Sequence, residues 1–276
     1  MSDPVTAPRA AGREPERALS AGGRTVRLLP RAPYEAGYVP RHGVVGFAFE
    51  AQCGAHAFGG DRRVPFRTRP NTLAWVPPGC DVWSRSDAGG EYLTVSTPVR
   101  VDAPSRRWSD RPHREAARAA LALRAGLLSD DLDAGEALAH VEAMERATLA
   151  PTNGEPVEDA AARWLTDARL RRIEEFLDAH ASDRVRVADL AAACGVSPGF
   201  LTRVCRAATG LTPHAWLLDR RLARARALLA GTDASVAEIA LATGFASHAH
   251  LTATMRRRIG VVPSRLRDRE PAPVAR

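Results

Sequence analysis

Two different spacings of apolar residues divide the chain. Between residues 24 and 100, short alternating or wholly apolar stretches recur, such as GVVGFAFEA, NTLAWVPPG and EYLTVSTPV. Pro and Gly turns separate these stretches at intervals of roughly ten residues, which is typical of small β-sandwiches and barrels. Further along, the apolar residues follow helical spacing instead. The chain is therefore expected to be α+β, with a small β-barrel first and helices after it.

Two helices are expected directly after the β-rich region, at 112–128 and 133–149, with a break at SDD. Each of them carries one apolar stripe. The stripes include Leu121, Leu128, Leu138, Val141 and Met144. Packing on the β-rich region and a dimer interface both explain such stripes, and the sequence leaves both interpretations open.

The second half of the chain contains two copies of one pattern. VADLAAACGVSPGFLTRVCRAATGLTP begins at Val187, and VAEIALATGFASHAHLTATMRRRIGVVP begins at Val236. In each copy a short helix ends at a glycine, the residue that most readily takes the left-handed conformation at a helix C-terminus. A second helix follows and ends at another glycine, with a proline shortly after it. The matching residues are Gly195 and Gly244, Gly210 and Gly260, and Pro213 and Pro263.

Capping residues mark the helix starts in both copies. Ser197 and Ser247 are N-cap candidates for the second helices. Ser235 and Glu238 have capping-box spacing at the start of the second copy. Arg186 stands at the position of Ser235 in the first copy, so that cap is expected to be missing. Helix, glycine turn and helix is the design of a helix-turn-helix unit, whose second helix lies in the DNA major groove.

The positive charge of the protein is confined to this repeated half. All 39 basic residues are Arg, and the net charge is +7. From Asp167 to the C-terminus there are 18 Arg against 11 Asp and Glu, which accounts for the whole net charge. A basic half joined to a neutral half indicates a polyanion-binding module attached to a second domain.

Residues 170–267 resemble the DNA-binding domain of the AraC/XylS family of bacterial transcription regulators. The resemblance is carried by the two copies, by LRRIEEFLDAH before them and by HAWLLDRRLARARALLAG between them. It implies seven helices, in which two helix-turn-helix units share a linker helix, expected at 214–231. At 1.5 Å per residue this helix spans roughly 27 Å. Successive major-groove faces lie roughly 34 Å apart, so one helix of this length suits two adjacent grooves.

The resemblance also implies which residues meet DNA. They are Ser197, Gly199, Thr202, Arg203, Arg206, Ser247, His248, Ala249, His250, Ala253 and Arg256. Arg203 is expected to contact a guanine, and Arg206 lies toward phosphate. Ala249 and Ala253 have no hydrogen-bonding side chain, so the second unit is expected to read shape, phosphate and thymine methyl groups more than base edges.

Residues 30–100 resemble the cupin-like effector domain that many members of this family carry. The stretches concerned are FRTRPNTLAWVPPGCDVW and EYLTVSTP. Trp75 and Trp83 flank the PPGCD turn between them. They have two interpretations, as the lining of an effector pocket or as core residues.

No metal, cofactor or catalytic residue is predicted. Metal-binding cupins carry an HxH pair followed by Glu on strands, whereas His42 and His56 stand alone. The only HxH, at 248–250, falls on the second recognition helix, where side chains two positions apart point in different directions. The N-terminal half also has no Ser/His/Asp, Cys/His or paired-carboxylate spacing that indicates catalysis.

The expected division of the chain has five parts. They are a disordered segment at 1–23, a cupin-like effector and dimerisation domain at 24–150, a linker at 151–166, the double helix-turn-helix domain at 167–267 and a disordered tail at 268–276. No apolar run approaches the roughly 20 residues that span a bilayer, and the N-terminus lacks the apolar region of a secretory signal. A cytoplasmic protein is expected, with Cys53, Cys80, Cys194 and Cys205 as free, mostly buried thiols.

The function expected is a sequence-specific DNA-binding transcription regulator and not an enzyme. Its partners are expected to be promoter or operator DNA and RNA polymerase, with a small-molecule effector and a second copy of the chain as further partners. The resemblance favours activation over repression. Two alternatives stay open: a cupin-type enzyme fused to a DNA-binding domain, and a non-specific DNA-binding protein.

Overall fold

The computed structural model describes residues 16–98, 106–149, 163–180, 183 and 185–267. These residues form two compact units, the first ending at residue 149 and the second beginning at residue 163. The expected tail at 268–276 and most of the expected linker lie outside the described residues.

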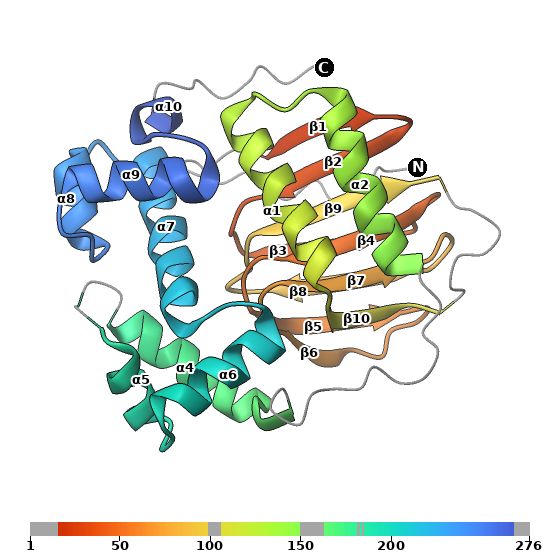
Figure 1. The fold of residues 1–276 in the computed structure, drawn as a ribbon. Helices are drawn as coiled ribbons and strands as arrows, with labels where there is room; N and C mark the ends of the chain where they lie inside the picture. Colours follow the sequence, from red (N-terminus) through yellow and green to blue (C-terminus); the bar gives the residue numbers. More distant parts are fainter. Residues whose placement is uncertain (1–15, 99–105, 150–162, 181–182, 184, 268–276) are drawn as a thin grey trace. The chain divides into compact units, whose positions relative to one another are not determined.

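The first unit contains two antiparallel sheets (Figure 1). Its strands are β1 (Arg17–Ala21), β2 (Arg24–Leu29), β3 (Tyr34–Tyr38), β4 (Gly43–Ala48), β5 (Gln52–Phe58), β6 (Val64–Thr68), β7 (Thr72–Val76), β8 (Val82–Ser86), β9 (Tyr92–Thr97) and β10 (Trp108–Pro112). One sheet has the strand order β1-β2-β9-β4-β7-β10, and the other has the order β3-β8-β5-β6. The predicted mixture of helix and sheet is confirmed.

The predicted small barrel is not confirmed, because the two sheets do not close onto one another in the described part of the chain. Two of the edge strands carry features that interrupt a ladder. Pro65 in β6 has no N–H to donate to a further strand. In β10 the pairing with β7 shifts register between Trp108 and Arg111, where Asp110 has a φ of 60°.

The first strand corrects the prediction of a disordered segment extending to residue 23. β1 pairs with β2 through a two-residue turn, Gly22–Gly23, with φ angles of 54° and 74°. Two glycines with positive φ make the tightest hairpin connection that matches strand twist. The GG pair between two short runs therefore carried a hairpin signal that composition alone concealed.

Helices α1 (Arg114–Ser129) and α2 (Ala134–Leu149) cover one face of the six-stranded sheet (Figure 1). The break between them falls at SDD as predicted, because Asp130 ends α1 in the left-handed conformation and Asp133 caps α2. Under the helices lies a fully buried row made of Val26, Leu28, Val45, Phe47, Leu73, Trp75, Leu93 and Val95. The apolar stripes of both helices thus pack on the β structure, the first of the two interpretations; the structure does not test the dimer.

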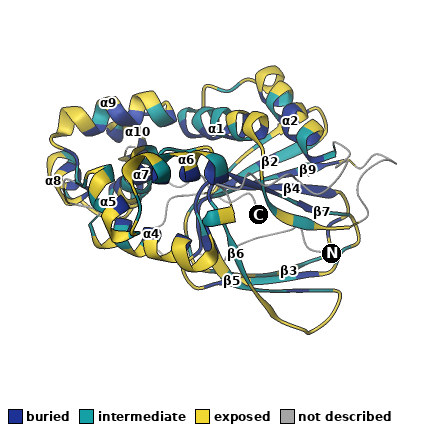
Figure 2. Ribbon diagram, turned by 60° about the horizontal axis from the view of Figure 1, so that its bottom comes forward, coloured by how far each residue is buried: buried dark blue, intermediate teal, exposed yellow. Residues whose placement is uncertain are grey.

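The opposite face of the six-stranded sheet lies toward the four-stranded sheet, so the unit has three layers (Figure 2). Tyr92 of β9 approaches Tyr34 and Tyr38 of β3 between the sheets. Burial, aided by the neighbouring Tyr34, raises the pKa of Tyr38 to about 12. The space between the sheets is thus enclosed enough to remove water from these phenols.

The second unit is all-helical in its described part. Its helices are α4 (Asp167–Ala179), α5 (Val187–Ala193), α6 (Pro198–Thr209), α7 (Pro213–Gly231), α8 (Val236–Ala242), α9 (His248–Ile259) and α10 (Pro263–Arg267). The long helix α7 has α4, α5 and α6 at one end and α8, α9 and α10 at the other (Figure 1). This is the predicted arrangement of two helix pairs on a linker helix.

Candidate nucleic-acid interface

The first helix-turn-helix is formed by α5 and α6. Gly195, with a φ of 68°, makes the turn after α5. The Ser197 hydroxyl accepts a hydrogen bond from the Phe200 N–H at 3.3 Å, and Pro198 occupies the first turn of α6. Gly210, with a φ of 72°, ends α6. The predicted cap and both predicted stops are therefore present in this copy.

The second helix-turn-helix, formed by α8 and α9, repeats this frame. The Ser235 hydroxyl accepts from the Glu238 N–H at 3.2 Å, and the Glu238 carboxylate accepts from the Ser235 N–H at 2.7 Å. Ser247 caps α9 by accepting from the His250 N–H at 3.1 Å. Gly260 ends α9 with a φ of 75°. The predicted capping box and N-cap are confirmed.

The start of α5 keeps half of the capping box. The Arg186 side chain makes no cap hydrogen bond, as expected for the missing serine. The Asp189 carboxylate nevertheless accepts from the Arg186 N–H at 2.9 Å and from its guanidinium at 3.3 Å. The backbone hydrogen bond, followed by the guanidinium, lowers the pKa of Asp189. One orphan donor of this helix start is thus satisfied without a serine.

One face of α6 is buried and the other is exposed. Leu201, Val204, Cys205 and Ala208 are fully buried. Gly199, Arg203 and Arg206 are exposed, and Thr202 is half-buried. The Thr202 hydroxyl donates to the Pro198 carbonyl at 2.8 Å, so only its lone pairs remain for DNA. Positions 199, 202, 203 and 206 therefore share one solvent-facing stripe, as helical spacing requires.

Arg203 is supported by two aromatic residues that the sequence analysis did not single out. Its guanidinium carbon lies 5.2 Å from the centroid of the Phe200 ring, within range of a cation–π contact. Phe200 in turn meets Trp164 edge to face at 5.4 Å. The FxxR spacing on one helix was the available sequence signal; Trp164 lies far away in the sequence and gave none.

The α9 helix exposes a smaller and more basic surface. His248, Ala249, His250, Ala253 and Arg256 are all exposed, as is Arg257, which was not predicted. The His250 Nδ1 atom accepts from the Ala246 N–H at 3.3 Å, and its ring meets Phe245 edge to face. His250 therefore helps to fix the turn before α9, in addition to lying on its exposed side.

Both helix pairs are fixed to the same segment of α7. Arg258 of α9 donates to Asp219 at 3.1 Å and to the Ala215 carbonyl at 3.0 Å. The next residue, Arg220, pairs with Glu174 of α4 at 3.4 Å and also with Asp178. Part of the arginine excess predicted to bind a polyanion is thus used inside the unit.

The structure places Trp75 and Trp83 in different sheets. Trp75, in β7, is 1% exposed and pairs across the sheet with Val45, so it is a core residue. Trp83, in β8, is half-buried; its indole N–H donates to Glu35 at 3.2 Å, and the Arg63 guanidinium lies 4.2 Å from its ring centroid. The two rings do not converge on one pocket.

The thiols differ from their predicted burial. Cys205 alone is buried, whereas Cys53 is exposed and Cys80 and Cys194 are half-buried; all four are free. Burial raises the pKa of Cys205 to about 12. Among the described residues, no three His, Cys, Asp or Glu side chains gather as metal ligands would. No helix in that part of the chain is long and apolar enough to cross a membrane.

Comparison with known proteins matches the second unit. Residues 190–269 match a family model described as a helix-turn-helix domain. The HTH-type transcriptional regulator ExsA of Pseudomonas aeruginosa is 30% identical over 113 residues, 41% of each chain. The HTH-type transcriptional activator RhaS of Escherichia fergusonii is 37% identical over 103 residues, 37% of each chain. The matched segment thus spans well under half of these relatives.

Among solved structures, two are similar to the same segment. One is the DNA-binding domain of AdpA, a global transcriptional factor, in complex with a target DNA; it is 33% identical, with a TM-score of 0.34, over 36% of this chain and 88% of that chain. The other is an AraC-type transcriptional regulator from Chromobacterium violaceum with the same identity, coverage and TM-score. The family match confirms the interpretation of the two copies as helix-turn-helix units.

Proposed function

With an AraC-type helix-turn-helix domain as its second unit, we propose that the protein is a sequence-specific DNA-binding transcription regulator. The observation that carries the proposal is the pair of exposed faces on α6 and α9. Neither helix contains an acidic residue, each presents exposed arginines, and both are packed against α7. Two basic helices on one rigid support suit two successive major grooves of one duplex.

The two helices have different proposed roles. Arg203 on α6 contacts the edge of a guanine, where a guanidinium can donate twice. Arg206 and, on α9, Arg256 bind phosphate. His248, Ala249 and Ala253 lie along the groove floor and sense its shape and thymine methyl groups.

The first unit is proposed to be a cupin-like module that controls the second through a small ligand or through pairing of two copies of the chain. The similarity to the transcriptional activator RhaS and to VirF, a virulence regulon transcriptional activator of Yersinia enterocolitica, favours activation, with RNA polymerase as partner. Such a regulator acts in the cytoplasm, on the chromosome, and has no catalytic role.

Fluorescence anisotropy of the whole protein tests the proposal. DNA from upstream of its own gene and of neighbouring genes is compared with a random duplex across a salt series. A specific regulator prefers one upstream site by about a thousandfold or more and protects two adjacent major grooves. Equal binding to both duplexes, with a steep loss as salt rises, would instead support the alternative of a non-specific DNA-binding protein.

A further inference from the structure

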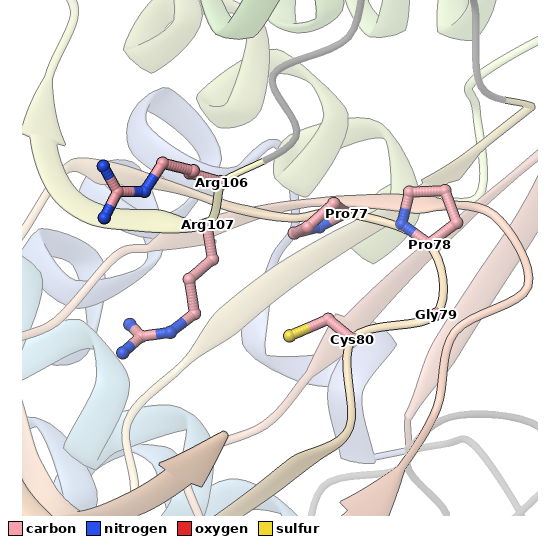
Figure 3. A pocket seen from close by; sticks show the side chains of 6 residues that line it. All are labelled: Pro77, Pro78, Gly79, Cys80, Arg106 and Arg107. Atoms are coloured by element: carbon pink, nitrogen blue, oxygen red, sulfur yellow. The ribbon is translucent and has the colours of Figure 1, made fainter. Parts of the chain in front are cut away.

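A concave site lies in the first unit, at the turn that joins β7 to β8 (Figure 3). Its volume is about 560 Å³ and it is open to solvent. The lining residues are Pro77, Pro78, Gly79, Cys80, Arg106 and Arg107. This volume suits a small organic molecule rather than a single ion.

One wall of the site is a rigid turn. The Cys80 N–H donates to the Pro77 carbonyl at 3.4 Å, and Gly79 has a φ of 72°. Proline followed by a glycine of positive φ is the pattern of a type II turn. The Gly79 N–H also donates to the Pro40 carbonyl at 2.8 Å, which ties the turn to the chain before β4. The two proline rings therefore offer a preformed apolar wall.

The facing wall carries two positive charges. Arg106 and Arg107 are both exposed, and neither forms an ion pair with any other described residue. The lining contains no carboxylate; the nearest one in the sequence, Asp81, follows Cys80 and is exposed. In Figure 3 the Arg107 and Cys80 side chains extend into the same space. The site therefore favours an anion.

Arg107 is held in place by a series of rings. Its guanidinium carbon lies 3.4 Å from the centroid of Phe58, so the flat face is occupied and the N–H groups at its edge stay available. Phe58 meets His56 edge to face at 4.6 Å, and His56 stacks on Phe66 at 5.2 Å. Burial, with Arg107 nearby, lowers the pKa of His56, so this imidazole is neutral at pH 7. Arg107 thus has an oriented edge and a neutral, apolar base.

We propose that this site binds a small organic carboxylate with a flat, apolar body. The carboxylate accepts two hydrogen bonds from the Arg107 guanidinium, with Arg106 adding charge. The apolar body lies against Pro77, Pro78 and Phe58. The proposal deepens the proposed function, on which it rests, by naming the chemical class of the ligand that acts on the first unit.

Calorimetric titration of the whole protein without DNA tests the assignment, with benzoate, benzamide and inorganic phosphate as probes. Benzoate binds at least tenfold more tightly than benzamide or phosphate, because only benzoate has both the charge and the apolar body. Arg107→Gln weakens benzoate at least tenfold and leaves benzamide unchanged. Arg63→Gln is the matched control, since Arg63 also stacks on a ring but lies outside this site; it leaves all three probes unchanged.

Alkylation of Cys80 gives a second measurement that needs no variant. Benzoate slows the reaction of Cys80 with N-ethylmaleimide severalfold and does not slow that of the exposed Cys53, as peptide mass spectrometry would show. Absence of saturable benzoate binding, equal binding of benzamide or phosphate, or unprotected Cys80 overturns the assignment. Because no DNA is present, such a failure leaves the proposed DNA recognition by the second unit standing.

Discussion

The α5–α6 and α8–α9 pairs share a backbone frame and differ in the side chains they expose. Both end their first helix with a positive-φ glycine nearby, cap the second helix with serine and stop it at glycine. At matching exposed positions the first pair has Arg203 where the second has Ala253. The residues that fix backbone conformation are thus repeated, whereas the residues that face solvent have diverged. The frame and the DNA-reading surface should therefore be separable by mutation.

The largest effect is expected in the shared core. Leu201 and Leu251 occupy equivalent buried positions, and both are 0% exposed. Leu201→Ala and Leu251→Ala should each lower the free energy of unfolding by about 2–5 kcal/mol, because each leaves a cavity. Leu241→Ala is the control: Leu241 is 64% exposed, so its loss should change stability by less than about 0.5 kcal/mol. Urea unfolding measures all three; clearly unequal losses for Leu201 and Leu251 would contradict equivalent frames.

The next effect separates the exposed faces. Arg203→Ala should cost about 1–3 kcal/mol on the specific site and little on random DNA, because it removes a base contact. Arg206→Ala and Arg256→Ala, at matching positions, should weaken both duplexes alike and each reduce the salt slope by about 1. Anisotropy titrations on both DNAs give these values. Equal losses on both for Arg203→Ala would exclude it as a base reader.

A smaller effect is expected from exchanging the two helix starts. Arg186→Ser completes the capping box of α5 and should raise the free energy of unfolding by about 1 kcal/mol. Ser235→Arg removes the cap of α8 and should lower it by a similar amount. The double variant should then unfold close to the unaltered protein, since the sites are independent. A destabilising Arg186→Ser would show that the guanidinium contact with Asp189 contributes more than a serine cap.

The smallest effect is pH-dependent. The hydrogen bonds from Ser235 lower the pKa of Glu238 below its ordinary value of 4.5. The charged form is thus stabilised in the folded state, so its contribution is present above pH 4.5 and is lost as pH falls through the lowered folded pKa. Glu238→Gln should therefore melt slightly below the unaltered protein at pH 7 and converge with it near pH 3. A difference that persists undiminished at low pH would exclude a charge effect.

The helices and their ends could be predicted from the sequence because their signals are local. SDD placed the break between α1 and α2, and SxxE placed the start of α8. Glycines before and after α6 and α9 marked turns that only a residue without a side chain adopts readily. Each of these features depends on residues within about one helical turn of one another, so spacing was sufficient.

Features that depend on distant parts of the chain were missed or left open. The spacing of the strands did not reveal that the two sheets stay apart, because pairing between sheet edges is not a local property. Trp75 and Trp83 were indistinguishable by motif, and only their separate sheets assign Trp75 to the core. The support of Arg203 by Trp164 through Phe200, and the anchoring of Arg258 on Asp219, join residues far apart in the chain. The Arg107 site likewise unites a turn with a distant arginine.

The adjacent residues Asp219 and Arg220 have a consequence for how binding sites can evolve. Because one holds α9 and the other holds α4, both reading helices are referred to a single point of one continuous helix. Adding one residue to α7 beyond that point would rotate the remainder of α7, together with α8 and α9, by about 100° about the helix axis and advance them by about 1.5 Å. On the proposed binding mode, such a change would turn one helix away from its groove. The operator's half-site spacing can therefore drift very little, whereas the bases inside each half-site can change freely with the exposed side chains.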